Sequence, residues 1–310
     1  MELKKLLWVK AEVSYGVDPT AAAADVVWAE NPVFTPKGQR VGGDPSMAGL
    51  GGIKDYMYGQ YGELTFEVPL GGSGTAGTAP KWGKLLLACG WAETISAGVS
   101  VTYALAANPA AGGSVAITFR QDRRKHVLSG ARGMVSFSFD EGKRPVAKFT
   151  FRGLLTAVAD GAVIAHSDAT WTGHNDIDPV SQAMTTFAFN SVNAPVRSLS
   201  FDQSDNVVFS DRPNQKQVDL AGARTWSGKL KISSQLPSVL NLESLAIANT
   251  LVTSTLVHGT TGGKILTVTA KSQLAMPTYS DDKGLDVTDV DLMLKPSAMN
   301  LDDQIALVCT

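Results

Sequence analysis

The chain has 310 residues, of which 44% are hydrophobic and 18% charged, and a formal net charge of −2. This composition is typical of a globular protein about two domains long, and it excludes a disordered chain and nucleic-acid binding through an overall positive charge. Two cysteines, Cys89 and Cys309, exclude a disulfide framework and a cysteine-ligated zinc site.

Near the N-terminus, only four apolar residues, 6–9, follow Lys4 and Lys5. This run is shorter than the hydrophobic part of a signal peptide and much shorter than a membrane span. We therefore expect synthesis in the cytoplasm and no membrane partner.

In chain order, period-two runs predict short antiparallel strands at 62–70, 99–106, 113–120, 133–140 and 146–153, and again at 227–236 and 251–258. In the first run, Leu64, Phe66 and Val68 alternate with polar side chains, so one face of the sheet is buried and the other is polar. Helices are predicted at 80–91, between Pro80 and Gly90, and at 237–249. The predicted fold class is mainly β.

The segment 72–77, Gly-Ser-Gly-Thr-Ala-Gly, has the spacing of a dinucleotide-binding turn. Such a turn needs a continuously apolar parallel strand before it and a helix that begins within the glycines. Here the preceding strand alternates and Pro80 delays the helix, and residues 77–85 also miss the P-loop spacing. We therefore interpret 71–77 as a flexible connector between a strand and a helix, and we expect no cofactor.

Candidate metal ligands and catalytic residues are sparse. His174, Asp176 and Asp178 lie within five residues and are the best metal candidates, but a polar linker explains them equally well. The other three histidines are scattered and match no catalytic motif. We therefore expect no metal site, no catalytic site and no enzymatic activity.

The chain also contains an internal repeat. Gly112 and Gly113 precede a strand-like run just as Gly262 and Gly263 do 150 residues later, and Gly133 and Gly284 repeat the relation at an offset of 151. The order strand, helix, strand at 62–106 recurs at 227–258. Repetition over four elements predicts two similar domains, 1–170 and 171–310, joined where periodicity is lost between 157 and 183.

Three stretches resemble the major tail tube protein of long-tailed bacteriophages: KLLWVKAEVSYGVDPTAAAADVVWAENPVFTP (5–36), GELTFEVPLGGSGTAGTAPKWGKLLLACGWAE (62–93) and FTFRG (149–153). The second stretch is the most specific, and the resemblance is weaker in the second half of the chain. It implies β-sandwich domains, each with one flanking helix. Their inner sheets would join those of neighbouring subunits into a ring-shaped β-barrel.

The resemblance also implies a function and partners. Rings of subunits would stack into the hollow tail tube of the virion and conduct the genome from capsid to host. A duplicated subunit implies a homotrimeric ring with pseudo-sixfold symmetry, assembled in the host cytoplasm. Tail terminator and tail-tip proteins would bind the ends of the tube. The tape measure protein, and then DNA without sequence-specific contacts, would occupy its lumen.

Candidate surfaces for this assembly follow from residue chemistry. The segment 36–61 is glycine-rich and longer than an ordinary hairpin connection, so its Tyr56, Tyr58 and Tyr61 are candidates for contact with an adjacent ring. DNA slides best along a neutral to acidic lining, because phosphate contacts with Lys or Arg add affinity. The lumen candidates are Glu63, Glu67, Asp289 and Asp291.

Equivalent windows of the two repeats carry opposite charge. Residues 120–152 hold nine basic and three acidic side chains, a balance of +6, whereas residues 271–303 hold three basic and seven acidic ones, a balance of −4. We predict that this contrast sets the order of domains around or between rings. The interface candidates are Arg123, Arg124, Lys125, Lys143, Arg144, Asp281, Asp282, Asp302 and Asp303.

Two other functions remain open at this point. A carbohydrate- or receptor-binding β-sandwich of a tail tip or adhesin requires an exposed aromatic cluster beside carboxylates, and Trp171 near Asp176 is a weak instance. A β-rich hydrolase requires a pair of carboxylates in a deep pocket.

Overall fold

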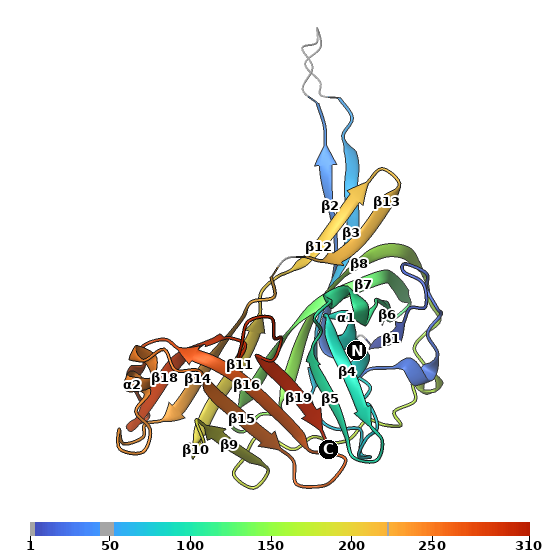
Figure 1. Ribbon diagram of the computed structural model, residues 1–310. Coiled ribbons are helices and arrows are strands. Elements are labelled where there is room, and N and C mark those ends of the chain that lie inside the picture. Colours follow the sequence, from blue (N-terminus) through green and yellow to red (C-terminus); the bar gives the residue numbers. More distant parts are fainter. Residues whose placement is uncertain (1–3, 44–52, 222) are drawn as a thin grey trace.

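The computed structural model describes residues 4–43, 53–221 and 223–310, which form mainly antiparallel strands and two short α-helices. The strands form a broad, curved body, and two hairpins project from it in the same direction (Figure 1). One of these hairpins is a separate two-stranded sheet, whereas the other named strands belong to a single hydrogen-bonded network. The mainly β fold class is confirmed.

The first half of the chain forms the N-terminal strand set. Its elements are β1 (Lys5–Ala11), β2 (Glu30–Val41), β3 (Tyr56–Pro69), α1 (Gly83–Ala88), β4 (Trp91–Ser96), β5 (Ser100–Leu105), β6 (Val115–Gln121), β7 (Arg124–Asp140) and β8 (Val146–Asp160). Antiparallel pairing places six strands in the order β1-β6-β7-β8-β3-β2. Strands β4 and β5 pair as a hairpin beside this ladder.

The second half forms the C-terminal strand set. Its elements are β9 (Thr185–Phe189), β10 (Val192–Asn193), β11 (Val196–Gln203), β12 (Val207–Arg212), β13 (Gln215–Leu220), β14 (Trp226–Ser233), α2 (Leu242–Ile247), β15 (Val252–His258), β16 (Leu266–Leu274), β17 (Thr278–Asp282), β18 (Leu285–Leu294) and β19 (Ile305–Cys309). Here antiparallel pairing gives the order β9-β15-β16-β18-β14-β11.

The two ladders have the same topology. Strands β1, β2, β3, β6, β7 and β8 correspond in chain order and in pairing order to β9, β11, β14, β15, β16 and β18. The helices also correspond, since α1 follows β3 and α2 follows β14. The sequence offsets place the repeat one strand away from this match, because they superpose the glycines before β6 on those before β16, whereas pairing equates β6 with β15. Extra strands β4 and β5 in the first set shift the offset.

Strand β7 joins the two sets, because its C-terminal half pairs with β8 along one edge and with β11 along the other. The result is one continuous sheet in the order β2-β3-β8-β7-β11-β14-β18-β17, which we call the long sheet. In the second half of this sheet β17 pairs with β18, just as the C-terminal half of β7 pairs with β8 in the first half. The long sheet therefore consists of two matching four-stranded halves.

Register fixes which residues correspond in the two halves. Phe34 pairs with Leu64 in the first half, and Leu199 pairs with Leu230 in the second. In this alignment Gly62 matches Gly228, and the first of the two bulges of β2, between Glu30 and Val33, falls at the same place as the bulge of β11. Two independent features thus support the same residue-by-residue match.

One face of the long sheet is apolar, as the alternation of Leu64, Phe66 and Val68 predicts. Phenylalanines from both halves are fully buried on this face: Phe66, Phe137, Phe139, Phe149, Phe151 and Phe201. The ring of Trp91 contacts Phe137 and Trp226 edge-on, at centroid distances of 5.9 and 5.7 Å. The core therefore runs without a break from one strand set into the other.

Both predicted helices exist but are shorter than expected. Helix α1 ends at Ala88 because Gly90 turns the chain with a φ of +85°, and β4 begins at Trp91. Helix α2 begins after Asn241, whose side-chain oxygen accepts a hydrogen bond from the Ser244 amide.

The glycine-rich segment 71–77 lies against the C-terminal strand set. The Gly74 amide donates a hydrogen bond to the Gly263 carbonyl at 2.9 Å, and a Cβ on Gly72 would overlap that same carbonyl. The Asn175 side chain also donates to the Gly72 carbonyl. The sequence interpretation of a flexible connector misses this role: the glycines are required because two backbones pack in direct contact.

Candidate assembly surfaces

The projecting hairpins correct one expectation from the sequence. The sequence predicts segment 36–61 as a loop too long for a hairpin connection. Instead, residues 36–41 belong to β2 and residues 56–61 to β3, and β2 pairs with β3 from Glu30 to Val41. The tip, 44–52, lies outside the described residues. Hairpin β12–β13 of the C-terminal set projects beside it (Figure 1). Strands extend this far because Tyr, Val and Met flank the glycines.

The three candidate tyrosines differ in their surroundings. Tyr61 stacks on Phe209 of β12 with ring centroids 4.7 Å apart, and the Tyr58 hydroxyl donates to the Asp211 carbonyl of the same hairpin. Tyr56 is 67% exposed, and the Lys54 ammonium lies over its ring at 5.8 Å. Tyr61 and Tyr58 therefore hold the two hairpins together, and Tyr56 is the candidate best placed to contact a neighbour.

The four lumen candidates share the polar face of the long sheet. Each lies directly opposite a basic residue on the adjacent strand: Glu63 opposite Arg152, Glu67 opposite Lys148, Asp289 opposite Lys231, and Asp291 opposite Lys229. The charges are exchanged between the two halves, because Glu63 and Arg152 correspond to Lys229 and Asp291. Acidic and basic side chains on this face are thus balanced, so the face is close to neutral rather than acidic.

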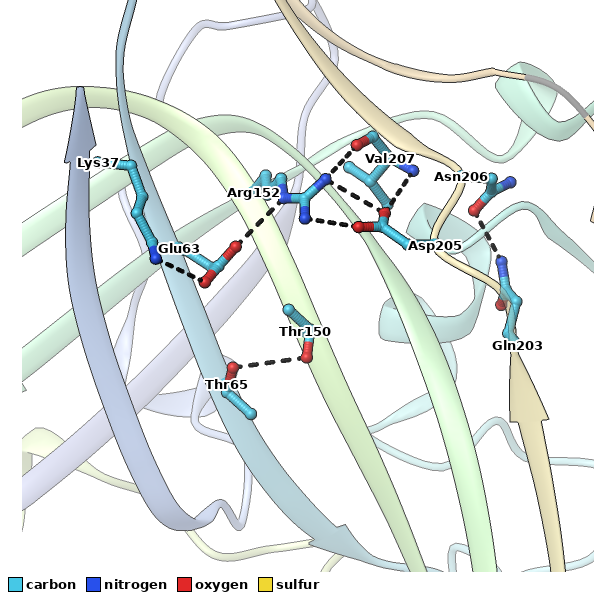
Figure 2. Close-up of polar contacts among 9 residues, drawn as sticks. All are labelled: Lys37, Glu63, Thr65, Thr150, Arg152, Gln203, Asp205, Asn206 and Val207. Atoms are coloured by element: carbon cyan, nitrogen blue, oxygen red, sulfur yellow. Dashed lines mark hydrogen bonds and ion pairs between the residues drawn. The ribbon is translucent and has the colours of Figure 1, made fainter. Parts of the chain in front are cut away.

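Arg152 organises the polar face where the first half meets the projecting hairpin (Figure 2). Its guanidinium donates to Glu63 at 3.2 Å and to Asp205 at 2.7 Å, and it also binds the Val207 carbonyl. Lys37 approaches the other oxygen of Glu63 at 3.6 Å. Burial lowers the pKa of Arg152, but the two carboxylates outweigh burial and raise the pKa above its ordinary value. One arginine thus ties β8, β3 and the β11–β12 connection together.

The basic interface candidates fall into two groups. Arg123 lies in the turn between β6 and β7, and Arg124 and Lys125 begin β7; no ion pair reaches these three residues from the described part of the chain. Lys143 and Arg144 lie in the turn between β7 and β8, where Lys143 pairs with Asp140 at 3.2 Å and Arg144 with Glu30 at 2.6 Å. Arg123, Arg124 and Lys125 are therefore the basic candidates that have no ion-pair partner within the described part of the chain.

The acidic candidates of the β17–β18 turn have local roles. Asp282 pairs with Arg197 of β11 at 3.0 Å, and Asp281 accepts a hydrogen bond from the Gly284 amide within the turn. The Asp282–Arg197 pair repeats, with signs reversed, the Arg144–Glu30 pair of the first half, since each joins a hairpin turn to the matching strand β11 or β2. The opposite charges of the two repeats therefore compensate within each half.

Asp302 and Asp303 also pair within the chain. Asp303 lies 2.6 Å from the Lys271 ammonium, and this contact together with hydrogen bonds from Ser297 holds its pKa well below the ordinary value. Asp302 lies 3.6 Å from Arg224, whose guanidinium also donates to the carbonyls of Gly90 and Ala106. These two acids stabilise the chain itself.

Several charged residues of these networks were not among the sequence candidates, including Arg152, Glu30, Arg197, Asp205 and Asp219. Asp205 binds Arg152, and Asp219 binds Arg132 at 3.3 Å. Both acids come from the second half and meet partners in the first, so neither spacing nor periodicity signals them.

The candidate metal residues do not form a site in the described residues, in which no group of three or more His, Cys, Asp or Glu side chains could hold an ion. The His174 ring lies edge-on against Trp171, and burial lowers the pKa of that histidine. His258 is buried, and its Nδ1 lies 2.8 Å from the Thr185 hydroxyl. Cys89 and Cys309 are free and buried. Among the described helices, none is long and apolar enough to cross a membrane.

Comparisons with known proteins give no match, either to a family model or to a curated protein. The chain's own geometry and the resemblance in its sequence are therefore the grounds on which its function can be inferred.

Proposed function

We propose that this protein is the major structural subunit of a phage tail tube, in which stacked rings of the chain form a hollow conduit for genomic DNA. The observation that carries this proposal is the long sheet, which has two matching halves, one buried face and one polar face. Sheet edges attract further strands, and a ring that closes on itself leaves none open.

The matching ladders support a duplicated domain. Residues 1–170 and 171–310 are then two copies of one tube domain, each a β-sandwich with a flanking helix. Three chains provide six such domains, so a homotrimer forms a pseudo-hexameric ring. The pairings of β7 with β11 and of β5 with β19 join the two domains of one chain.

The polar face of the long sheet suits the lining of a DNA channel. Its opposed acids and bases leave little net charge, so a passing phosphate backbone meets no basic stripe that would retain it. In this proposal the lumen holds the tape measure protein during assembly and DNA during ejection. Terminator and tail-tip proteins close the ends of the tube in the virion.

Electron microscopy and mass measurement of the purified protein test the proposal. We expect rings of three chains that stack into hollow tubes as protein concentration rises. Discrete single-chain particles at all concentrations, or rings of six chains, would contradict it. Binding of such single particles to a panel of glycans would instead favour the receptor-binding alternative.

A further inference from the structure

The contact between β7 and β11 within the chain implies a second, equivalent contact between chains. In the observed junction, β11 lies antiparallel to β7, with Ser200 opposite Ser138 and Asp202 opposite Ser136. This junction lies in the middle of the long sheet, where the last strand of the first half, β7, meets the first strand of the second half, β11. The strands that correspond to them, β2 and β17, stand at the two ends of the same sheet.

Both end strands have an open edge in the described part of the chain. Strand β2 pairs with β3 and strand β17 with β18, and the ladders found in residues 4–43, 53–221 and 223–310 place nothing on the other side of either strand. Residues 36–41 of β2 and 278–281 of β17 are exposed. Exposed edges of this kind are templates for strand addition.

We propose that β2 of one copy of this chain docks antiparallel on β17 of a second copy, as β11 docks on β7 within the chain. Residue matching sets the register. Because Thr35 and Lys37 correspond to Ser200 and Asp202, and Asp282 and Ser280 to Ser138 and Ser136, the contact places Thr35 opposite Asp282 and Lys37 opposite Ser280.

Charge supports this choice of partner. The β17 edge carries Asp281 and Asp282, whereas β2 carries Lys37, opposite Ser280 in this register, and Arg40, just beyond the end of β17. Two β2 edges or two β17 edges would bring like charges together, so the contact is head-to-tail. Pro36 corresponds to Phe201 and lacks a backbone amide donor. The junction between chains therefore has fewer backbone hydrogen bonds than the internal one. A weaker pairing of this kind suits a contact that forms after each chain has folded.

The inference rests on the proposed self-assembly and specifies the surfaces that carry it. Cysteine cross-linking tests it with the double variant Lys37→Cys, Ser280→Cys, since residues directly opposite on antiparallel strands lie within disulfide reach. Both native cysteines are buried. The internal counterpart, Ser136→Cys with Asp202→Cys, is the positive control and closes within one chain.

We expect oxidation of the Lys37→Cys, Ser280→Cys variant to give a covalent ladder of chains in non-reducing electrophoresis. A mixture of the two single variants should stop at dimers, and the shifted pair Val33→Cys, Ser280→Cys should give no ladder. Rings in the microscope without this ladder would overturn the strand assignment and leave the proposed function standing. Single-chain particles in a sample whose internal control closes would contradict the proposed function itself.

Discussion

Single residues decide how closely the two halves of the chain approach each other. The clearest case is Gly72, whose Cα faces the Gly263 carbonyl so closely that a methyl group has no room. The neighbouring Gly262 faces open space and has no positive φ. The two glycines occupy the same contact region and differ in steric demand, which makes them a matched pair.

We expect Gly72→Ala to lower the free energy of unfolding by about 1–3 kcal/mol, because an added methyl forces two packed backbones apart. Gly262→Ala should be neutral or stabilising by about 0.4–1 kcal/mol, since it only restricts the unfolded chain. Urea titration followed by tryptophan fluorescence measures both. Equal midpoints for the two variants would show that the contact carries no packing constraint.

At the scale of elements, the polar face is held by arginine contacts that cross from one element to the next. Arg152 connects β8 to β3 and to the segment before β12, whereas Lys148, four residues earlier on the same face, is exposed and lies opposite Glu67. Loss of the partly buried arginine and loss of the exposed lysine should therefore affect the stability of the protein differently.

We expect Arg152→Ala to destabilise the protein by about 1–3 kcal/mol, because it leaves Asp205 without its charged partner and leaves Glu63 to the more distant Lys37. Lys148→Ala should change stability by less than about 0.5 kcal/mol. Hydrogen exchange should further show faster exchange in β12 and β13 for Arg152→Ala alone. Unchanged exchange there would mean that Tyr58 and Tyr61 suffice to hold the two hairpins together.

The sequence predicts which strands and helices are present better than it predicts where each begins and ends. Period-two alternation predicts β3, β6, β7 and β8. Burial alternates along β3 and along the C-terminal half of β7, whereas β6 is buried on both faces over most of its length. The length of the β2–β3 hairpin was missed, since glycines at 38, 42 and 43 look like a loop when the partner strand is not known. Cross-half pairs such as Arg152–Asp205 depend on topology and leave no local signal.

On the scale of the whole molecule, the sequence predicts a repeat, and the two strand ladders share one topology. The glycine offsets match β6 to β16, whereas hydrogen-bond pairing matches β6 to β15, because β4 and β5 are inserted in the first set. The sequence also predicts the charge of the two windows but not the partners of those charges. The windows 120–152 and 271–303 do differ in sign, but the structure gives several of their charges partners inside each half, including Arg144 and Asp282.

The last prediction concerns the polar face of the assembled protein. If this face lines the channel, then Glu67→Lys together with Asp291→Lys makes the lining basic, because Lys148 and Lys229 opposite them lose their acidic partners. Assembled particles of this variant should retain double-stranded DNA at low salt and release it as salt rises, since each phosphate contact expels counterions. The unaltered protein should release DNA under the same conditions.

A control variant makes the same change in net charge at two other positions. Asp160→Lys with Asp176→Lys alters two exposed acids, one at the far end of β8 and one in the connection before β9. Nuclease protection separates the two variants, because DNA inside a channel is shielded whereas DNA on an outer surface is cut. Protection by the first variant only is the expected result, and equal protection by both would place this polar face outside the channel.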